Sequence, residues 1–380
     1  MKIAMIGHKR IPSREGGVEI VVGELSRRMV SLGNSVTAFN RKSEHIAGKE
    51  FDTDFGKKEW NGVSLKWVAT PNSSKLNAIV YSAFATARAL FGNYDIIHFH
   101  AEGPSSMVPL AKLFGKKCVV TIHGLDWQRS KWGGFATKFL QYGEKCAAKY
   151  ADEIIVLSKN VQQYFFDKYG RETVYIPNGI EKPKPIEANI IKHQYSLEKD
   201  GYILYLGRIV PEKNIHSLIE AYSQISTDKK LVIAGGASHT SEYAASLKEQ
   251  AKSNKNIVFT GFVQGAELEE LYSNAYIYCL PSDLEGMPIS LLEAMSYGNC
   301  CLTSDICECT EVCGKNAVYF KKGDTADLKN KLEDFLGDSE KVAEYKKCAS
   351  EYVCSKYNWD DITDKTLSIY GRIKYENIIC

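Results

Sequence analysis

Short apolar runs that alternate with longer amphipathic segments constrain the fold of this chain most. Between the first two runs, apolar residues over 18–32 recur at helical spacing, and Gly33 follows as a stop signal. Strands that alternate with helices predict a parallel sheet with helices on its faces. Six runs in the first half have the length of strands: 2–6, 35–39, 94–99, 117–122, 153–157 and 173–176.

The alternation is interrupted once and then repeats. A turn signal at Pro177-Asn178-Gly179 and a polar, proline-containing stretch at 182–185 indicate a linker. The first helix beyond it is expected to start after Asn214 as N-cap. The second set of strand-like runs is 202–206, 230–234, 256–259, 276–280, 300–303 and 316–320. The 380 residues therefore predict an α/β protein of two tandem Rossmann-like domains facing across a cleft, at the carboxyl ends of both sheets.

The formal net charge is only +2, but it is unevenly distributed. Residues 1–180 carry 25 Lys/Arg against 16 Asp/Glu, and much of the excess lies between Pro104 and Tyr150. This asymmetry favours an anionic partner for the first half, a membrane surface or a phosphate-bearing substrate, although a solvated basic face would have the same composition. No recognised nucleic-acid motif accompanies the charge, so nucleic acid is not expected as a partner.

Apolar runs and cysteines indicate the compartment. No run reaches the roughly 18–20 residues that cross a bilayer, and the N-terminus lacks a signal-peptide cleavage site. The eleven cysteines include no C-x-x-C pair, and Cys307, Cys309 and Cys313 lack zinc-like spacing and a nearby histidine. We expect reduced thiols, no metal and no cofactor, in a cytoplasmic protein that contacts the inner face of the membrane peripherally.

Two places in the chain suit a phosphate. Gly16 and Gly17 open the first helix, where bare backbone N–H groups meet the positive end of the helix dipole. Their spacing does not fit G-x-G-x-x-G, which disfavours a nicotinamide dehydrogenase. Arg208 follows the strand 202–206 and Lys213 precedes the next helix. Two cations at that edge could stabilise a departing diphosphate without a metal ion.

The segment after the fourth strand of the second set is the most informative. Pro288 suits the first residue of a helix, so Glu285 lies in the loop before it and Glu293 about 1.5 turns inside. Gly286 and Met287 would present backbone N–H groups at the helix mouth. Carboxylates accept hydrogen bonds from paired sugar hydroxyls. Capping and surface glutamates are the alternative, but the glycine, proline and spacing fit a cradle for a sugar nucleotide.

These motifs together resemble the family 4 retaining glycosyltransferases, a bacterial group that shares the GT-B fold with glycogen synthase. The resemblance spans nearly the whole chain. It rests on four motifs in order: Gly16-Gly17, Pro177-Asn178-Gly179, Gly207-Arg208 with Lys213-Asn214, and Glu285-x7-Glu293.

The resemblance implies the roles of the site residues. The donor would be a nucleotide-diphosphate sugar, whose ribose hydroxyls bind Glu293 and whose diphosphate binds Arg208 and Lys213. His123 matches the family's histidine near the donor sugar, although a histidine at a strand end is as often structural. The catalytic set is Glu285, Arg208, Lys213 and His123, and the donor-binding set adds Gly16, Gly17, Gly286, Met287, Pro288 and Glu293.

The family also implies which domain binds which substrate and how the reaction proceeds. Residues 1–180 would bind the acceptor, 190–358 would bind the donor, and a last helix at about 359–380 would cross back onto the first domain. Transfer would retain the anomeric configuration through an oxocarbenium-like state. The departing phosphate would take the acceptor's proton, with Glu285 as covalent nucleophile the less favoured alternative.

The acceptor, a saccharide or a lipid-linked saccharide, is expected to contact the carboxyl edge of the first sheet. Candidate residues, which mix aromatic and charged side chains, are His100, Asp126, Trp127, Arg129 and Trp132. An ordinary amphipathic loop would look similar. We expect His98 and His100 to point to opposite faces of their strand and therefore not to share a metal.

We therefore expect a retaining, metal-independent glycosyltransferase in cell-surface polysaccharide biosynthesis. A GT-B-fold epimerase acting on a sugar nucleotide would instead convert its donor without an acceptor. A catalytically silent nucleotide-sugar-binding protein would bind the donor without turnover.

Overall fold

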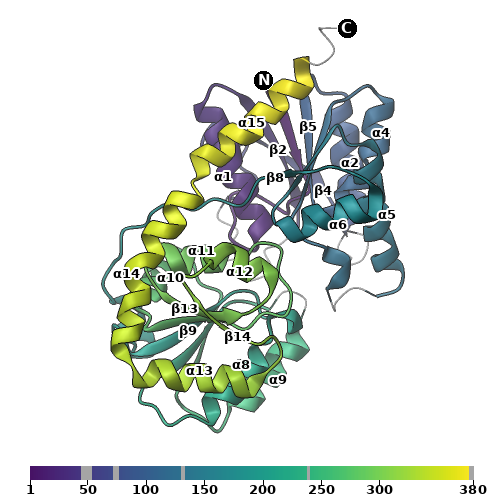
Figure 1. Ribbon diagram of the computed structural model, residues 1–380. Helices are drawn as coiled ribbons and strands as arrows, with labels where there is room; N and C mark the ends of the chain where they lie inside the picture. The colour runs from purple at the N-terminus through teal and green to yellow at the C-terminus, as the bar shows by residue number, and fades with distance from the viewer. Residues whose placement is uncertain (44–53, 72–76, 130–132, 238–239, 376–380) are drawn as a thin grey trace. The chain divides into compact units, whose positions relative to one another are not determined.

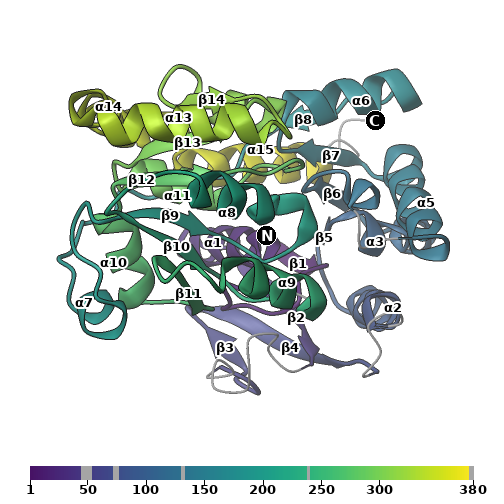
Figure 2. The same ribbon diagram turned by 90° about the horizontal axis from the view of Figure 1, so that it is seen from below.

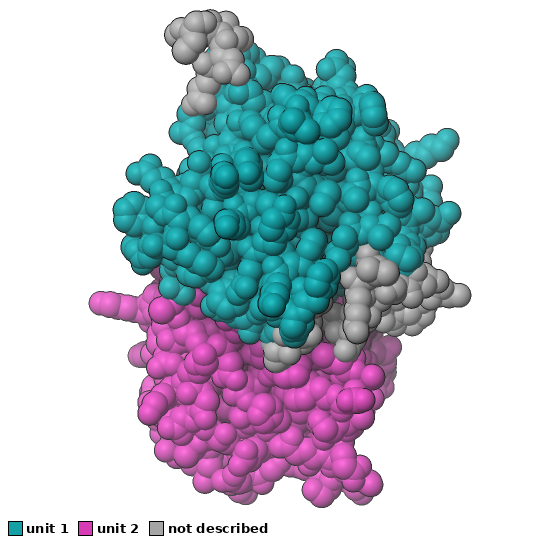
Figure 3. All heavy atoms as spheres, turned by 90° about the vertical axis from the view of Figure 1, so that its right-hand side faces the viewer, with its two compact units in different colours: residues 1–179, 359–380 teal, residues 180–358 magenta. Residues whose placement is uncertain are grey.

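A computed structural model describes residues 1–43, 54–71, 77–129, 133–237 and 240–375 (Figure 1). The chain forms two compact units, which Figure 3 colours separately. Unit 1 comprises residues 1–179 and 359–380, and unit 2 comprises residues 180–358. Each unit is built on its own largely parallel sheet, as the alternation of strands and helices predicts.

The sheet of unit 1 has eight strands in the order β3-β4-β2-β1-β5-β6-β7-β8. Every neighbouring pair is parallel except β3 and β4. The strands are β1 Lys2–Ile6, β2 Ser35–Lys42, β3 Glu59–Trp60, β4 Val63–Ala69, β5 Ile96–His100, β6 Cys118–Ile122, β7 Glu153–Val156 and β8 Val174–Tyr175.

The antiparallel pair β3–β4 was not among the predicted strands. It forms a hairpin at one edge of the sheet (Figure 2), and β4 alternates buried Val63 and Leu65 with exposed residues. Its turn is Asn61-Gly62, with φ of 46° and 76°. An Asn-Gly pair with two positive φ angles is the preferred two-residue hairpin connection. That dipeptide was therefore the sequence signal for the missing strands.

Helices cover both faces of this sheet. Ile97 and Phe99 of β5 lie in the cluster of buried side chains that includes Tyr81, Val108 and Ala147 from three helices. The alternate residues of β5 point to the other face, which α15 covers (Figure 1). The helices of unit 1 are α1 Gly17–Ser31, α2 Asn77–Leu90, α3 Glu102–Ser105, α4 Val108–Leu113, α5 Phe135–Tyr150, α6 Lys159–Tyr169 and α15 Trp359–Tyr375.

Unit 2 holds a six-stranded, wholly parallel sheet in the order β11-β10-β9-β12-β13-β14. Its strands are β9 Tyr202–Leu206, β10 Lys230–Ala234, β11 Ile257–Gly261, β12 Ile277–Leu280, β13 Cys300–Ser304 and β14 Val318–Phe320. Its helices are α7 Ile190–Tyr195, α8 Ile215–Ser223, α9 Ser241–Ala251, α10 Ala266–Asn274, α11 Ile289–Ser296, α12 Cys307–Cys313, α13 Thr325–Gly337 and α14 Ser339–Lys356. Among the described residues, no helix is both long and apolar enough to cross a bilayer.

Asn214 precedes α8 as predicted, but it does not cap the helix with its side chain. Its backbone is left-handed, with φ 53°, and its side-chain oxygen accepts a hydrogen bond from the Ser217 hydroxyl at 2.7 Å. A 3-10 turn at Pro211–Lys213 runs directly into this residue. Asparagine tolerates the left-handed conformation that turns the chain from one helical segment into the next.

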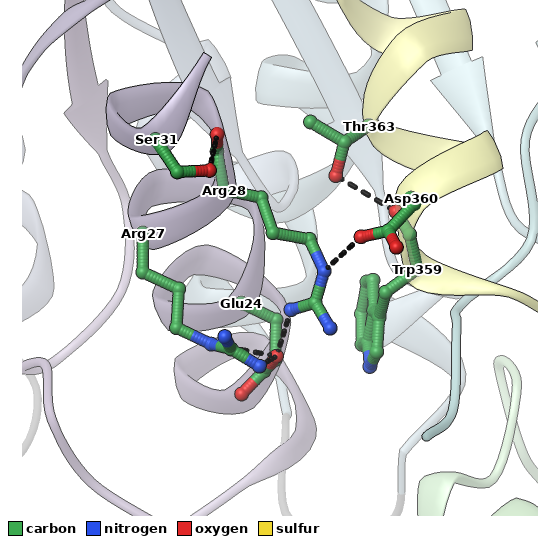
Figure 4. Close-up of polar contacts among 7 residues, drawn as sticks. All are labelled: Glu24, Arg27, Arg28, Ser31, Trp359, Asp360 and Thr363. Atoms are coloured by element: carbon green, nitrogen blue, oxygen red, sulfur yellow. Dashed lines mark hydrogen bonds and ion pairs between the residues drawn. The ribbon is translucent and has the colours of Figure 1, made fainter. Parts of the chain in front are cut away.

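The C-terminal helix α15 is fastened to α1 by Arg28 (Figure 4). The Arg28 Nε donates to Asp360 Oδ1 at 2.9 Å, and its guanidinium lies 5.8 Å from the centre of the Trp359 ring. Arg28 also pairs with Glu24, one turn earlier on α1. The Arg28 side chain is only 9% exposed, so its cation–π contact is largely shielded from water.

We predict that Arg28→Met loosens α15. Loss of the cation–π contact and the ion pair should cost about 1–2 kcal/mol of unfolding free energy. Hydrogen exchange over 359–375 should become faster. Arg27→Met is the matched control, because Arg27 also binds Glu24 but its side chain is 31% exposed. Equal exchange in the two variants would contradict the role given to Arg28.

Gly7, directly after β1, allows the ends of two strands to approach closely. Its φ is +126°, and a Cβ there would lie 2.1 Å from the carbonyl oxygen of His100 at the end of β5. We predict that Gly7→Ala lowers the unfolding free energy by about 2 kcal/mol or more and lowers the thermal midpoint. Gly133→Ala, which meets no atom within 4 Å, should leave the midpoint unchanged. An unchanged midpoint in Gly7→Ala would show that the backbone relaxes there.

Candidate functional site

Two predicted cations follow β9 at the carboxyl edge of the unit 2 sheet. Lys213 ends the 3-10 turn before α8, and its side chain is 10% exposed. Arg208 lies just after β9, and the Tyr205 hydroxyl donates to its backbone carbonyl at 2.9 Å. Gly235, with φ +148°, follows the neighbouring β10, and a Cβ there would lie 1.8 Å from the Gly207 carbonyl oxygen. The loops after β9 and β10 therefore pack backbone against backbone next to Arg208.

The loop from β12 into α11 carries the predicted carboxylates. Pro288 is the N-cap of α11, with ψ 105°, and the helix begins at Ile289, one residue later than predicted. The extended backbone of Pro288 explains this shift, because a helical first residue needs negative ψ. Glu285 lies in the loop with a side chain 8% exposed, and Glu293 lies on the helix.

Lys213 and Glu285 form an ion pair between these two loops. A second link joins the loops, because the backbone N–H of Asp283 donates to the Glu212 carbonyl at 2.9 Å. Both charged side chains are nearly buried, so each offsets the desolvation of the other. The structure therefore pairs Lys213, predicted to bind the diphosphate, with Glu285, predicted to bind the sugar.

Three tyrosines support Glu293 and its helix α11. The Tyr272 hydroxyl donates to Glu293 Oε2 at 3.0 Å, and the Tyr297 ring stacks on Tyr272 with centroids 5.4 Å apart. The Tyr278 hydroxyl donates to Ser290 Oγ at 2.9 Å. Sequence reasoning missed these tyrosines, because nothing in their local sequence distinguishes them from core aromatics.

In unit 1, histidines from two neighbouring strands come together. Nδ1 of His100 lies 3.1 Å from Nε2 of His123. Nδ1 of His98 lies 2.5 Å from the Tyr370 hydroxyl of α15, and its Nε2 lies 2.7 Å from Thr121 Oγ1. Each of the three histidines therefore has a hydrogen-bonding partner on a neighbouring element.

The expectation that His98 and His100 point to opposite faces is wrong. Residues two apart in a strand share a face, and the two rings lie 4.1 Å apart between centroids. Burial lowers the pKa of His98 to about 3 and that of His123 to about 4, so both are neutral near pH 7. Among the described residues, no group of three or more His, Cys, Asp or Glu side chains is arranged to hold a metal ion.

Glu144 of α5 anchors the predicted acceptor segment. Its side chain is fully buried, and its Oε2 accepts from the indole N–H of Trp127 at 2.9 Å. Its Oε1 accepts from the Tyr164 hydroxyl at 2.8 Å, from Lys168 Nζ at 2.9 Å and from the Tyr169 hydroxyl at 2.5 Å. Sequence reasoning named Trp127 but missed its anchor, since no pattern links a helix glutamate to a distant indole.

The other acceptor candidates have different surroundings. Asp126 and Arg129 pair with each other at 2.8 Å, with side chains 26% and 18% exposed. Burial, together with Asp126 and Glu144, raises the pKa of Glu102 to about 10. The Glu102 carboxyl group, which is close to this pair, is therefore neutral. Trp132 lies outside the described residues.

The glycine loop follows β1 at the same edge of the unit 1 sheet. Gly17 is the first residue of α1, one residue before the predicted start, and Gly16 is its N-cap, so the pair opens the helix as the sequence predicted. The Glu19 side chain in the first turn accepts from the backbone N–H of Lys9 at 2.8 Å, which ties the loop to the helix. The helix therefore begins on two residues without side chains, next to an anchored loop.

The predicted residues thus form two groups, one in each unit. In unit 2, Arg208, Lys213, Glu285 and Glu293 lie on segments that follow β9 and β12. In unit 1, the end of β5 and the segments that follow β1 and β6 carry Gly16, Gly17, His100, His123, Asp126, Trp127 and Arg129. Each group can bind hydroxyl or phosphate groups through charged side chains and helix N-termini.

Comparison with known sequences assigns both units to one class of protein. The family described as "Glycosyl transferases group 1" matches residues 187–352, and "Glycosyltransferase Family 4" matches residues 15–182. The alpha-maltose-1-phosphate synthase of Mycolicibacterium smegmatis is 24% identical over 307 residues, which are 73% of this chain and 79% of that protein. The O-antigen chain mannosyltransferase B of Escherichia coli is 26% identical over 202 residues, about half of each chain (52% and 51%).

Solved structures agree on the fold. Sucrose-phosphate synthase from Thermosynechococcus elongatus superposes with a TM-score of 0.83 at 21% identity, over 98% of each chain. The Anabaena protein Alr3699/HepE, in complex with UDP and glucose, superposes with a TM-score of 0.80 at 18% identity, over 98% of this chain and 99% of its own. The two family matches together span nearly the whole chain, which therefore belongs to the group 1, family 4 glycosyltransferases with the GT-B fold.

Proposed function

We propose that this glycosyltransferase moves a sugar, with retention, from a nucleotide-diphosphate sugar to a glycan or lipid-linked glycan in cell-surface polysaccharide synthesis. The observation that carries the proposal is the Lys213–Glu285 pair beside Arg208 and the N-terminus of α11. It joins a cation suited to a diphosphate to a carboxylate suited to sugar hydroxyls. The UDP and glucose bound by the Anabaena protein and the O-antigen relative support this donor and this pathway.

In the proposed reaction the bond between the anomeric carbon and the diphosphate oxygen breaks. The acceptor hydroxyl oxygen bonds to that carbon on the same face, and its proton passes to the departing phosphate oxygen. Arg208 and Lys213 offset the charge that develops on the diphosphate, so the proposal needs no metal ion. Glu285 accepts hydrogen bonds from sugar hydroxyls, and Glu293, oriented by Tyr272, accepts from the ribose.

We predict that the protein is stabilised thermally by one nucleotide sugar from a panel of UDP-, GDP-, ADP- and dTDP-sugars, and that it releases the nucleoside diphosphate in EDTA. Lys213→Ala and Arg208→Ala should lower kcat/KM by about 10²-fold or more, because each removes a cation from the developing charge. Glu293→Ala should abolish the thermal shift.

Lys252→Ala is the control, since that lysine is 73% exposed on the surface of unit 2. Its kinetics should match the wild type. A protein that responds to no donor and no free nucleotide would overturn the proposed function. Donor conversion that needs no acceptor would point to an epimerase, and binding without turnover to a silent sugar-nucleotide-binding protein.

We further propose that unit 1 docks on an anionic membrane through α4 and α5. Leu110, Leu113 and Phe114 lie on one side of α4 and its end, and the last two are 82% and 55% exposed. One exposed stripe of α5 has helical spacing and is mostly basic: Phe135, Lys138, Tyr142, Lys145 and Lys149. Apolar side chains flanked by lysines suit the interface of a bilayer with anionic lipids.

We predict that the protein sediments with vesicles containing anionic lipid at low salt and dissociates as salt rises, because surface charges are screened. Replacing Lys138, Lys145 and Lys149 with alanine should weaken binding by roughly 1 kcal/mol per lysine. The matched control replaces Lys248, Lys252 and Lys255, three exposed lysines of unit 2. Failure of the wild type to bind such vesicles at low salt would overturn membrane docking.

A further inference from the structure

The contact between His100 and His123 leaves one nitrogen of His123 for a ligand. Nε2 of His123 faces Nδ1 of His100 at 3.1 Å, so Nδ1 is the nitrogen that this contact does not occupy. His123 is 9% exposed and follows β6 at the carboxyl edge of the sheet, where ligands of parallel α/β domains bind. Rotating the His123 ring by 180° about its Cβ–Cγ bond would place a carbon opposite His100 and lose the hydrogen bond.

His100 is itself held in place. It is fully buried, and its ring lies against His98, with centroids 4.1 Å apart and 32° between the planes. His98 is fixed at both nitrogens, by the Tyr370 hydroxyl and by Thr121 Oγ1. The ring that contacts His123 is therefore packed against a ring that cannot turn without losing two hydrogen bonds.

Charge repulsion does not disturb the contact at neutral pH. Burial lowers the pKa of both His100 and His123, so both rings are neutral near pH 7. A neutral imidazole has one N–H donor and one acceptor nitrogen, and two such rings make a single hydrogen bond when the donor of one meets the acceptor of the other. The protonation of His100 Nδ1 thus determines which nitrogen of His123 carries the proton.

We propose that His100 is a positioning residue for the transferase reaction, which holds the His123 ring so that its Nδ1 faces a sugar hydroxyl of the bound substrate. This inference rests on the proposed function for the identity of the substrate. It assigns His100 to the support of His123 rather than to direct contact with the acceptor.

Paired amide substitutions test which nitrogen of His123 is used. The amide of asparagine occupies the place of Nδ1, and that of glutamine the place of Nε2. His123→Asn should therefore keep kcat within about tenfold of the wild type, whereas His123→Gln should lose about 10²-fold. The reverse order, or equal losses, would overturn the assignment of Nδ1.

A second pair tests the role of His100. His100→Asn keeps a polar group near Nδ1, and His100→Leu removes it while filling the space. The leucine variant should lower kcat by about tenfold or more with an unchanged donor KM and thermal midpoint, and the asparagine variant should recover most of the rate. Equal rates in the two variants, or a rate loss explained by a fall in thermal midpoint, would overturn the positioning role.

Nitrogen NMR of ¹⁵N-histidine-labelled protein separates this inference from the proposed function, because it needs no substrate. His123 should show a single tautomer at pH 7 in the wild type, and its nitrogen shifts should change in His100→Leu. Unchanged shifts would overturn the contact between the rings even in an active enzyme. A wild type without turnover would overturn the proposed function, while the spectra would still decide the orientation of His123.

Discussion

Parallel strand pairing is the constraint on which both groups of site residues depend. Apart from β3–β4, every described strand pair is parallel, so the loops after the strands of a unit collect at one edge. Lys213 and Glu285, 72 residues apart, meet there in unit 2. The same edge of each sheet contains a glycine with positive φ, Gly7 in unit 1 and Gly235 in unit 2, where a side chain would collide with the neighbouring backbone. Close approach of strand ends is therefore built into both units.

Buried polar groups near these edges are compensated in different ways. Glu144 accepts hydrogen bonds from four donors, and Glu285 pairs with Lys213. Glu102 lies beside Asp126 and Glu144, so a raised pKa leaves it neutral. The histidines remain neutral and hydrogen-bond to each other or to hydroxyls. Each arrangement avoids an isolated buried charge, which would cost several kcal/mol, and so fixes the side chains around the candidate site residues.

The last helix completes the first unit in two ways. At its start, Trp359 packs against Gly179, where a Cβ would come within 2.4 Å of the ring, and Asp360 binds Arg28. Ten residues further along, Tyr370 reaches His98 and so supports the histidines of β5. Residues at the end of the chain thus contribute to the core that supports His98, a residue from the first half of the chain.

From its sequence alone, the protein could be assigned to parallel α/β architecture with two strand arrays and to its family, because strand and helix periodicity and the Glu285-x7-Glu293 motif are local patterns. Strand positions agreed closely, except for the β3–β4 hairpin, whose Asn61-Gly62 turn was overlooked. Which side chains meet was decided only by tertiary structure, because the contacts of Lys213 with Glu285, Glu144 with Trp127, and His98 with Tyr370 join distant segments. Strand geometry alone places His98 and His100 on one face, but His100 meets His123 only because β6 lies beside β5.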